Sequence, residues 1–458
     1  MDRTEARARA RVQREWAFRQ QALGEILERN STLPAGVQSV AVVGAANTRP
    51  SFLHAVLGPA VGRPGEEATL AESMHALSQA AARLSAFGVF EDVAVAVDRA
   101  ANGAEHDLAA VLTVREKSRL SARTGVDVGN NEGSSYVNLT LRNALGGAET
   151  VEANAVLGTR TRSSYELSLQ SPIRANPDVL AQIGGYALNR DHTFYASHEQ
   201  IVRGGFAKLQ FPSRLGRHEV AYQGLWRQLT ALQPAASAAM LAEAGDSLKS
   251  SISHSLVCDT RDDPLLPTSG SFFQTTAELA GRVLGGDVSY IKLEAEESFA
   301  LAVYRGVTAS AGLRGGVLCS LDVASRFADR FQLGGPAGVR GFHQHGLGPR
   351  QGKDSLGGDV FLAGGASLFF PLPRTSPQSP LRLQLFVNGG SLLAMDPPQL
   401  AMDTARQLVR RPSVAAGFGL VYRHPVARFE LNFCLPLSAR ANERTQKGLQ
   451  FGVGLSFL

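Results

Sequence analysis

The stretch RFELNFCL, residues 428–435, alternates between large apolar side chains and other side chains. The apolar residues all occupy odd positions: Phe429, Leu431, Phe433 and Leu435. Glu430 and Asn432 occupy the even positions between them. Because successive side chains of a β-strand point to opposite faces, this period of two predicts a strand in a sheet with one apolar and one polar face.

The same alternation returns elsewhere. It is found in YVNLTLR (136–142), TVEANAVLG (150–158), YELSLQ (165–170) and LQFGVGLSFL (449–458). Turn-rich segments such as NNEGSS and NALGGAE separate these stretches, so neighbouring strands are expected to form antiparallel hairpins. A soluble β-sandwich would also alternate. Here, however, the pattern continues to the last residue without a helical layer, and a final strand is what a closed barrel needs to cover its edge.

Membrane strands of about 9–11 residues with their turns fit into residues 118–458 about 16 times. The alternation therefore predicts a transmembrane antiparallel β-barrel of about 16 strands. Residues 36–117 differ, since helical and strand periods follow one another in the order β-α-α-β-β, which predicts a small α+β domain. Residues 1–35 are rich in arginine but also carry acids and have no apolar core, so we expect a charged helical or flexible segment and not a secretory signal.

Composition, net charge and cysteine spacing exclude several classes of protein. Of the 458 residues, 44% are hydrophobic and 19% are charged, which is typical of a folded protein. The net charge of +5 is too mild and too dispersed to indicate nucleic-acid binding. Cys258, Cys319 and Cys434 are far apart and lack a metal-ligand spacing, so we expect small apolar fillers and neither a disulfide framework nor a zinc site.

Three motifs resemble binding sites for phosphate or metal ions but lack the spacing that such sites need. GLGPRQGKD lacks the four-residue interval of a phosphate-binding P-loop and the Ser or Thr that follows its lysine. His343 and His345 offer two metal ligands without a third, and the acids of DTRDDP do not have the register of a calcium loop. DTRDDP is better explained as a hairpin turn. No catalytic constellation stands out, so we expect a protein that is not an enzyme and needs neither metal nor cofactor.

Several longer motifs, which follow one another along the chain, indicate a protein family more specifically. They are CDTRDDPLLPTSGSFFQTTAELAG (258–281), GGPAGVRGFHQHGLGP (334–349), LGGDVFLAGGASLFFPLP (356–373) and the C-terminal QFGVGLSFL. Together they resemble the bacterial surface antigen family of outer-membrane assembly barrels, and 36–117 is similar to a polypeptide-transport-associated (POTRA) domain. Within that family the chain is most similar to the central barrel of the mitochondrial sorting and assembly machinery, because bacterial and plastid relatives usually carry several such domains and this chain has room for one.

This resemblance implies a function and a place. The protein would insert and fold unfolded β-barrel precursors in the mitochondrial outer membrane, in contact with its lipid and with other subunits of the sorting and assembly complex. The POTRA-like domain would face the intermembrane space. A precursor strand could pair with a seam between the first strand (about 118–129) and the last (about 448–457) by β-augmentation. The alternatives are a passive porin-type channel and a POTRA transporter that secretes a partner protein.

The resemblance also implies site residues. Val339, Arg340, Gly341 and Phe342 match the VRGF motif of a loop that enters the barrel lumen, here about 332–358, which we call the lumen loop. Bacterial relatives pair this arginine with acids, but here Asn388 and Ser367 stand where acids are expected. The candidate partners of Arg340 are therefore Asn388, Asp359, Asp354 and Ser367. The C-terminal residues that fit a mitochondrial β-signal and the seam are Gln450, Gly452, Gly454, Leu455 and Phe457.

Overall fold

The protein was analysed as a computed structural model. It describes residues 24–61, 68–101, 106–129, 132–304, 306–321, 324–376, 379–395, 402–454 and 457. These fall into two compact units. The first comprises residues 1–121, 140–151 and 170–180, and the second comprises residues 122–139, 152–169 and 181–458. Most of the predicted N-terminal segment lies outside the described residues, of which 24–29 are helical.

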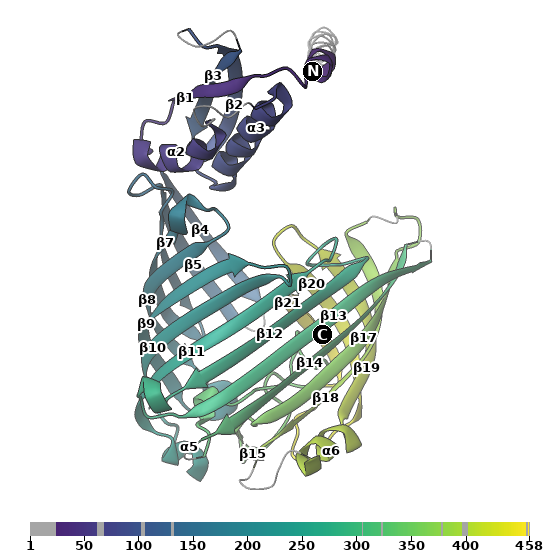
Figure 1. The fold of residues 1–458 in the computed structure, drawn as a ribbon. Coiled ribbons are helices and arrows are strands. Elements are labelled where there is room, and N and C mark those ends of the chain that lie inside the picture. The colour runs from purple at the N-terminus through teal and green to yellow at the C-terminus, as the bar shows by residue number, and fades with distance from the viewer. Residues whose placement is uncertain are drawn as a thin grey trace. The chain divides into compact units, whose positions relative to one another are not determined.

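The first unit contains the predicted β-α-α-β-β order (Figure 1). Its elements are β1 (Gly36–Val43), α2 (Pro50–Leu57), η1 (Gly58–Ala60), α3 (Leu70–Ala86), β2 (Phe90–Arg99) and β3 (Asp107–Glu116). The sheet order is β1-β3-β2, in which β1 runs parallel and β2 antiparallel to β3. This confirms the α+β region that the sequence predicts.

Local signals explain where helix α3 begins and which face it buries. Thr69 and Glu72 form a capping box, so their side chains satisfy backbone N–H groups that the first helical turn leaves unpaired. Leu77, Ala80 and Leu84 are buried at helical spacing and pack with Leu112 of β3 in one core. Gly88, at φ +69°, follows the helix and lets the chain turn into β2.

The second sheet contains sixteen strands, and Figure 1 shows it curling into a barrel. The strands are β4 (Leu120–Gly129), β5 (Glu132–Arg142), β6 (Thr150–Gly158), β7 (Thr161–Pro172), β8 (Leu180–Asp191), β9 (Glu199–Pro212), β10 (Arg217–Thr230), β11 (Gly245–Asp259), β12 (Gly270–Ala280), β13 (Tyr290–Tyr304), β14 (Val307–Ser320), β17 (Val360–Pro371), β18 (Leu381–Leu393), β19 (Ser413–Arg423), β20 (Arg428–Ser438) and β21 (Gly448–Gly454). Each strand pairs with its successor in the chain, and β14 pairs with β17 across the lumen loop. The ladders from β9 to β21 are antiparallel.

The alternation of RFELNFCL has a definite direction in this sheet. Leu431 and Phe433 are 44% and 39% exposed, whereas Glu430 and Asn432 are 1% and 2% exposed. The apolar face therefore points outward and the polar face points into the barrel. A soluble sandwich would bury its apolar face instead, so this orientation is that of a barrel surrounded by hydrocarbon.

The remaining elements are short and lie in the connections between strands. They are η2 (Ile173–Ala175), α4 (Thr193–Ala196), α5 (Ala238–Ala242), η3 (Arg282–Leu284), η4 (Phe327–Asp329), β15 (Arg350–Gln351), β16 (Asp354–Ser355) and α6 (Met402–Arg410). β15 and β16 form a small hairpin within the lumen loop. Among the described residues, none of the helices combines the length and the apolar character needed to span a membrane.

Candidate functional site

The lumen loop is packed against the inner wall of the barrel. Val339, Phe342 and Leu347 are fully buried and belong to one apolar cluster with residues of β17, β18 and β19, among them Phe361 and Leu392. The apolar members of VRGF therefore serve as packing contacts. This packing fixes the loop backbone and places the guanidinium of Arg340 inside the protein.

Arg340 forms an ion pair with Glu430 of β20. Its Nε lies 3.0 Å from Glu430 Oε2, and its Nη2 lies 3.3 Å from Oε1. The two side chains are 1% and 0% exposed. Arg428 forms a second ion pair with Glu430, and Asn432 donates a hydrogen bond of 2.7 Å to the same carboxylate. One acid thus pairs with two buried arginines, which makes it the electrostatic centre of the site.

The predicted partners of Arg340 are corrected by this pairing, because each has other surroundings. Asp359 accepts hydrogen bonds from Ser325 and from the Met395 N–H, and Asp354 accepts one from the Ser237 N–H. Ser367 accepts a hydrogen bond of 2.8 Å from Gln384. The amide atoms of Asn388 are buried without a hydrogen-bond partner among the described residues.

Gln450 of β21 holds the backbone of the VRGF motif. Its Oε1 accepts a hydrogen bond of 2.9 Å from the Gly341 N–H, and its Nε2 donates one of 2.9 Å to the Phe342 carbonyl. We call this pair of bonds the Gln450 clamp. The polar residue of the predicted β-signal therefore faces inward and binds the lumen loop. Sequence reasoning assigns Gln450 no such role.

Two glycines permit this close approach. Gly341 has φ +83°, and a Cβ added there would lie 2.6 Å from the Cβ of Ala415. A Cβ on Gly452 of β21 would lie 2.9 Å from the Cβ of Pro336 in the loop. Real Cβ atoms do not come this close, so only glycine fits at either position. Crowding on the inner face therefore accounts for Gly452.

Aromatic rings complete the surroundings of the two arginines. The Arg340 guanidinium lies 4.9 Å from the ring centroid of Phe386 and 5.7 Å from that of Phe457. Arg428 lies 4.9 Å from the Phe457 ring. Cation–π contacts of this kind favour a charged guanidinium where water is excluded. Gly454 pairs with Arg428 in the β20–β21 ladder, and Leu455 lies outside the described residues.

The lumen loop also contacts the connections after β6 and β8. Arg160 donates a hydrogen bond of 3.1 Å from Nη1 to Gln344 Oε1 and stacks on Phe194, with 3.7 Å from its Cζ to the ring centroid. The rings of Tyr195 and His345 have centroids 4.1 Å apart. His343, by contrast, is exposed. No group of three or more potential metal-ligating side chains is found among the described residues.

An ion pair holds the segment that precedes the lumen loop. Arg227 of β10 donates hydrogen bonds of 2.8 and 2.5 Å to the two carboxylate oxygens of Asp329. The hydroxyl of Tyr290 donates to the same carboxylate at 3.2 Å, and Lys292 donates to the Asp329 carbonyl at 2.9 Å. The entry of the loop is thus fixed to the wall formed by β10 and β13.

The DTRDDP stretch forms the turn between β11 and β12. Asp262 accepts hydrogen bonds from Thr268 and Ser269, and Asp263 accepts them from the N–H groups of Leu265 and Leu266. Asp259 pairs with Arg261, and Asp263 pairs with Arg423 of β19. Backbone capping and ion pairs thus account for all three acids, as expected for a hairpin turn. Leu266 packs against Phe369 and Val421 of the barrel wall.

Three histidines predict a pH dependence. His345 lies in the lumen loop, and His192 and His198 lie in the connection between β8 and β9 that His345 contacts. Burial, with the nearby charges of Arg190 and Arg160, lowers the pKa of His345 from 6.5 to about 4. Burial, with His198 and Arg190, lowers the pKa of His192 to about 3, and burial also lowers that of His198. Below pH 6.5 the unfolded chain takes up protons that the folded protein excludes, so stability is complete above that pH and declines toward pH 4.

We therefore expect thermal stability in detergent to fall between pH 7.5 and 5.5, by about 1 kcal/mol for each excluded proton at the lower pH. His345→Asn should reduce this slope, because asparagine tolerates the φ of +55° at that position but carries no imidazole. His343→Asn is the matched comparison and should reduce the slope less, because burial also lowers the pKa of His343 but its side chain is exposed. Equal slopes for wild type and His345→Asn, measured by differential scanning fluorimetry, would contradict the assignment.

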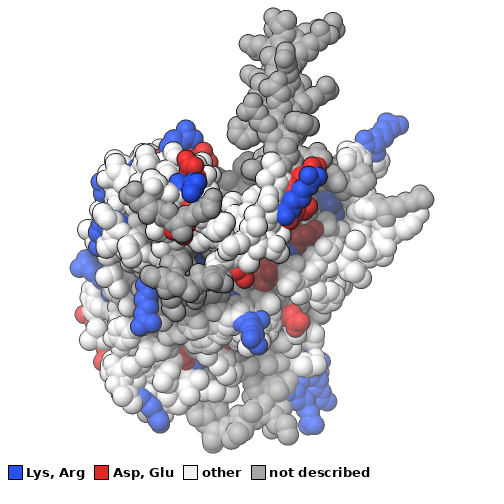
Figure 2. Space-filling view, turned by 45° about the horizontal axis from the view of Figure 1, so that its top comes forward, with Lys and Arg blue, Asp and Glu red and all other residues white. Residues whose placement is uncertain are grey.

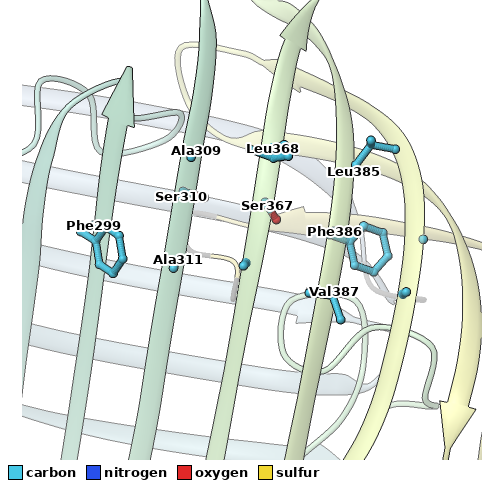
Figure 3. Close-up of a pocket in the computed structure, with 12 residues that line it drawn as sticks. Phe299, Ala309, Ser310, Ala311, Ser367, Leu368, Leu385, Phe386 and Val387 are labelled. Atoms are coloured by element: carbon cyan, nitrogen blue, oxygen red, sulfur yellow. The ribbon is translucent and has the colours of Figure 1, made fainter. Parts of the chain in front are cut away.

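The outward face of the sheet carries an apolar groove of about 420 Å³ across β13, β14, β17, β18 and β19 (Figure 3). Small side chains line it between larger ones: Phe299, Ala311, Ala366, Leu385, Val387 and Ala416. Phe299, Leu385 and Val387 are about half exposed, as a surface in contact with hydrocarbon requires. On the face shown in Figure 2, charged side chains are scattered and do not form one patch.

A sixteen-stranded antiparallel sheet with an apolar outer face, a polar interior and a buried internal loop defines a transmembrane β-barrel with a lumen loop. The Omp85 superfamily domain matches residues 143–457. A SAM50-like protein of Schizosaccharomyces pombe is 40% identical over 95% of this chain and 94% of its own length. The human sorting and assembly machinery component 50 homolog is 34% identical over 96% and 93%. The chain therefore belongs to the Omp85 superfamily and, within it, to the sorting and assembly machinery component 50 family.

Solved structures agree with this fold. BamA from Haemophilus ducreyi lacking POTRA domains 1–3 superposes with a TM-score of 0.77 at 18% identity, covering 92% of this chain and 84% of that one. CdiB from Acinetobacter baumannii gives a TM-score of 0.54 at 12% identity, covering 92% of this chain and 73% of that one. At these identities the likeness concerns the fold.

Proposed function

We propose that the protein inserts and folds β-barrel precursors in the mitochondrial outer membrane by offering a strand template at a seam between β4 and β21. The observation that carries this proposal is the strand order, in which β4 and β21 are the two ends of the sixteen-stranded sheet. The names of its relatives, sorting and assembly machinery components, support the same role. Other subunits of such a complex would be its partners.

The task needs hydrogen-bonding groups and no catalytic residue. A strand entering hydrocarbon leaves backbone N–H and C=O groups unpaired, at a cost of several kcal/mol each. A free strand edge on the barrel satisfies those groups while the precursor folds. Membrane lipid is the other partner, and its acyl chains would lie in the apolar groove of the outer face. The α+β domain would face the intermembrane space.

A passive channel is the weaker alternative, because two segments occupy the interior. The lumen loop is buried against β17 to β21, and the β11–β12 turn reaches Phe369 and Val421 on the barrel wall. Arg428 connects them, since it pairs with Glu430 and donates to the Leu265 carbonyl of that turn. A channel for free diffusion needs an open interior, whereas these contacts hold two segments inside the barrel.

Depletion of the protein followed by import of a radiolabelled porin tests the proposed role. We expect assembled porin to disappear on native gels while import of a matrix protein continues. The matrix protein is the control for general damage to the organelle. Normal porin assembly after depletion would exclude the role, and conductance without any effect on assembly would favour a channel.

The seam makes a sharper prediction. Single cysteines at Val126 of β4 and Phe451 of β21, which are 74% and 50% exposed, should form crosslinks with a precursor arrested during assembly. Ile252 of β11 is the control, because it is 41% exposed on a strand far from both sheet ends. Cys258 and Cys319 are replaced by serine in all variants, and Cys434 is kept because it is buried. Adducts at Ile252 as frequent as those at Val126 and Phe451 would contradict templating at the seam.

A further inference from the structure

The lumen loop is bound to strands near both ends of the sheet. On one side, Arg340 and the backbone of Gly341 and Phe342 are bound by Glu430 of β20 and Gln450 of β21. On the other side, Gln344 and His345 contact the connections that follow β6 and β8. In the strand order, β20 and β21 end the sheet on one side, and β6 and β8 are the third and fifth strands from the other end. The loop therefore joins the strands on the two sides of the seam.

The two attachments differ in what their rupture exposes. Separation of Arg340 from Glu430 would leave a buried acid and a buried base without each other, and loss of the Gln450 clamp would leave two buried backbone groups unpaired. At the other attachment, one partly buried hydrogen bond joins Arg160 to a neutral amide, His345 contributes a ring contact, and Leu356 packs against the small apolar cluster that includes Tyr195. No buried ion pair of the described residues is broken when these contacts separate. Arg160 and Gln344 would both find water after separation. The second attachment is thus the one that opens more easily.

We propose that Gln344 and His345, held by Arg160, Phe194 and Tyr195, form a releasable latch that joins the lumen loop to the N-terminal strands and must open when the seam opens. We call these five residues the latch. The inference rests on the proposed seam between β4 and β21. It assigns positioning roles to the latch residues, since none of them would touch the precursor.

A reversible crosslink across the latch tests whether its opening is required. Arg160→Cys and Gln344→Cys, in a chain with Cys258→Ser and Cys319→Ser, are joined by a reducible bis-methanethiosulfonate whose span matches the two lost side chains. The matched control joins Ala239→Cys in α5 to Gln351→Cys in the lumen loop. The Ala239 N–H donates a hydrogen bond of 3.1 Å to Gln351 Oε1, and neither residue belongs to the latch. Among the described residues, none of these four side chains is hydrogen-bonded to β4 or β21.

We expect the crosslinked latch to reduce porin assembly about tenfold or more, the control crosslink to leave it unchanged, and reduction of the linker to restore it. Full assembly with the latch crosslinked would overturn the inference, while precursor adducts at Val126 and Phe451 would still support the seam. If adducts are absent from the uncrosslinked protein, the proposed function itself fails. The two failures are therefore distinguishable.

A second readout does not depend on precursors. In planar bilayers, Gln344→Ala combined with His345→Asn should raise the frequency of large-conductance openings several-fold, because the loop is then held from one side. His343→Asn, an exposed neighbour in the same loop, should not change it. Equal opening frequencies in these two variants would overturn the latch even if porin assembly were affected.

Discussion

Glu430→Ala is expected to prevent the barrel from folding into lipid vesicles. The carboxylate is fully buried and forms ion pairs with both Arg340 and Arg428. Its removal leaves two cations without their shared acid inside the protein. Breaking a buried pair from one side costs about 3–5 kcal/mol, and here a single change breaks two pairs. That is comparable to the whole stability of many domains, about 5–15 kcal/mol.

Arg340→Ala should be milder, because Glu430 would keep its contacts with Arg428 and Asn432. Glu430→Gln separates charge from shape, since it keeps the volume and loses the negative charge. Folding yield is measured by the heat-dependent mobility of the refolded protein on gels. The expected order of loss is Glu430→Ala, then Glu430→Gln, then Arg340→Ala. A greater loss for Arg340→Ala than for Glu430→Ala would show that the acid is not the centre of the network.

Gly341→Ala is expected to displace the VRGF motif and to lower the yield of folded barrel strongly. The added methyl would lie 2.6 Å from the Cβ of Ala415, and the backbone conformation at φ +83° is itself unfavourable for alanine. Relief of the clash requires the loop to move away from β19, which breaks the Gln450 clamp. Two buried backbone groups then lose their partners, at about 1–3 kcal/mol each.

Gly338→Ala is the matched control three residues earlier. A Cβ there meets nothing closer than 3.6 Å, so ordinary van der Waals contact results. The two alanine variants differ by position alone, and limited proteolysis within residues 334–349 reports whether the loop has left the wall. Equal protease resistance and equal folding yield in both variants would show that the close approach at Gly341 is unimportant.

Much of the architecture follows from local patterns. The alternation in RFELNFCL and its counterparts predicts strands, and the turn residues between them predict hairpins, because side-chain direction and turn chemistry are set by a few consecutive residues. The acids of DTRDDP are explained as turn residues by the same local logic, and the structure confirms it. The β-α-α-β-β order likewise follows from short-range periodicity and caps.

The electrostatic centre was harder to predict. Glu430 stands on the polar face of the stretch that reveals the fold, and the only signal available was an acid on the inner face of the penultimate strand. Two of the predicted partners of Arg340, Asn388 and Ser367, stand where bacterial relatives carry acids, and the other two, Asp359 and Asp354, are acids of this chain in the same region. The contact of Gln450 with the loop was not predicted either, because its place in the β-signal motif says nothing about the side to which its amide points.

The sequence by itself thus determined a barrel of alternating strands, its α+β region and the loop that carries VRGF. Only the tertiary structure decided that Arg340 pairs with Glu430, 90 positions away, that Gln450 binds the loop backbone, and that Gln344 and His345 contact the connections after β6 and β8. The physical reason is that periodicity records the direction of a side chain relative to its own strand. Which side chains meet across a lumen depends on the curl of the whole sheet and on the path of a loop through it.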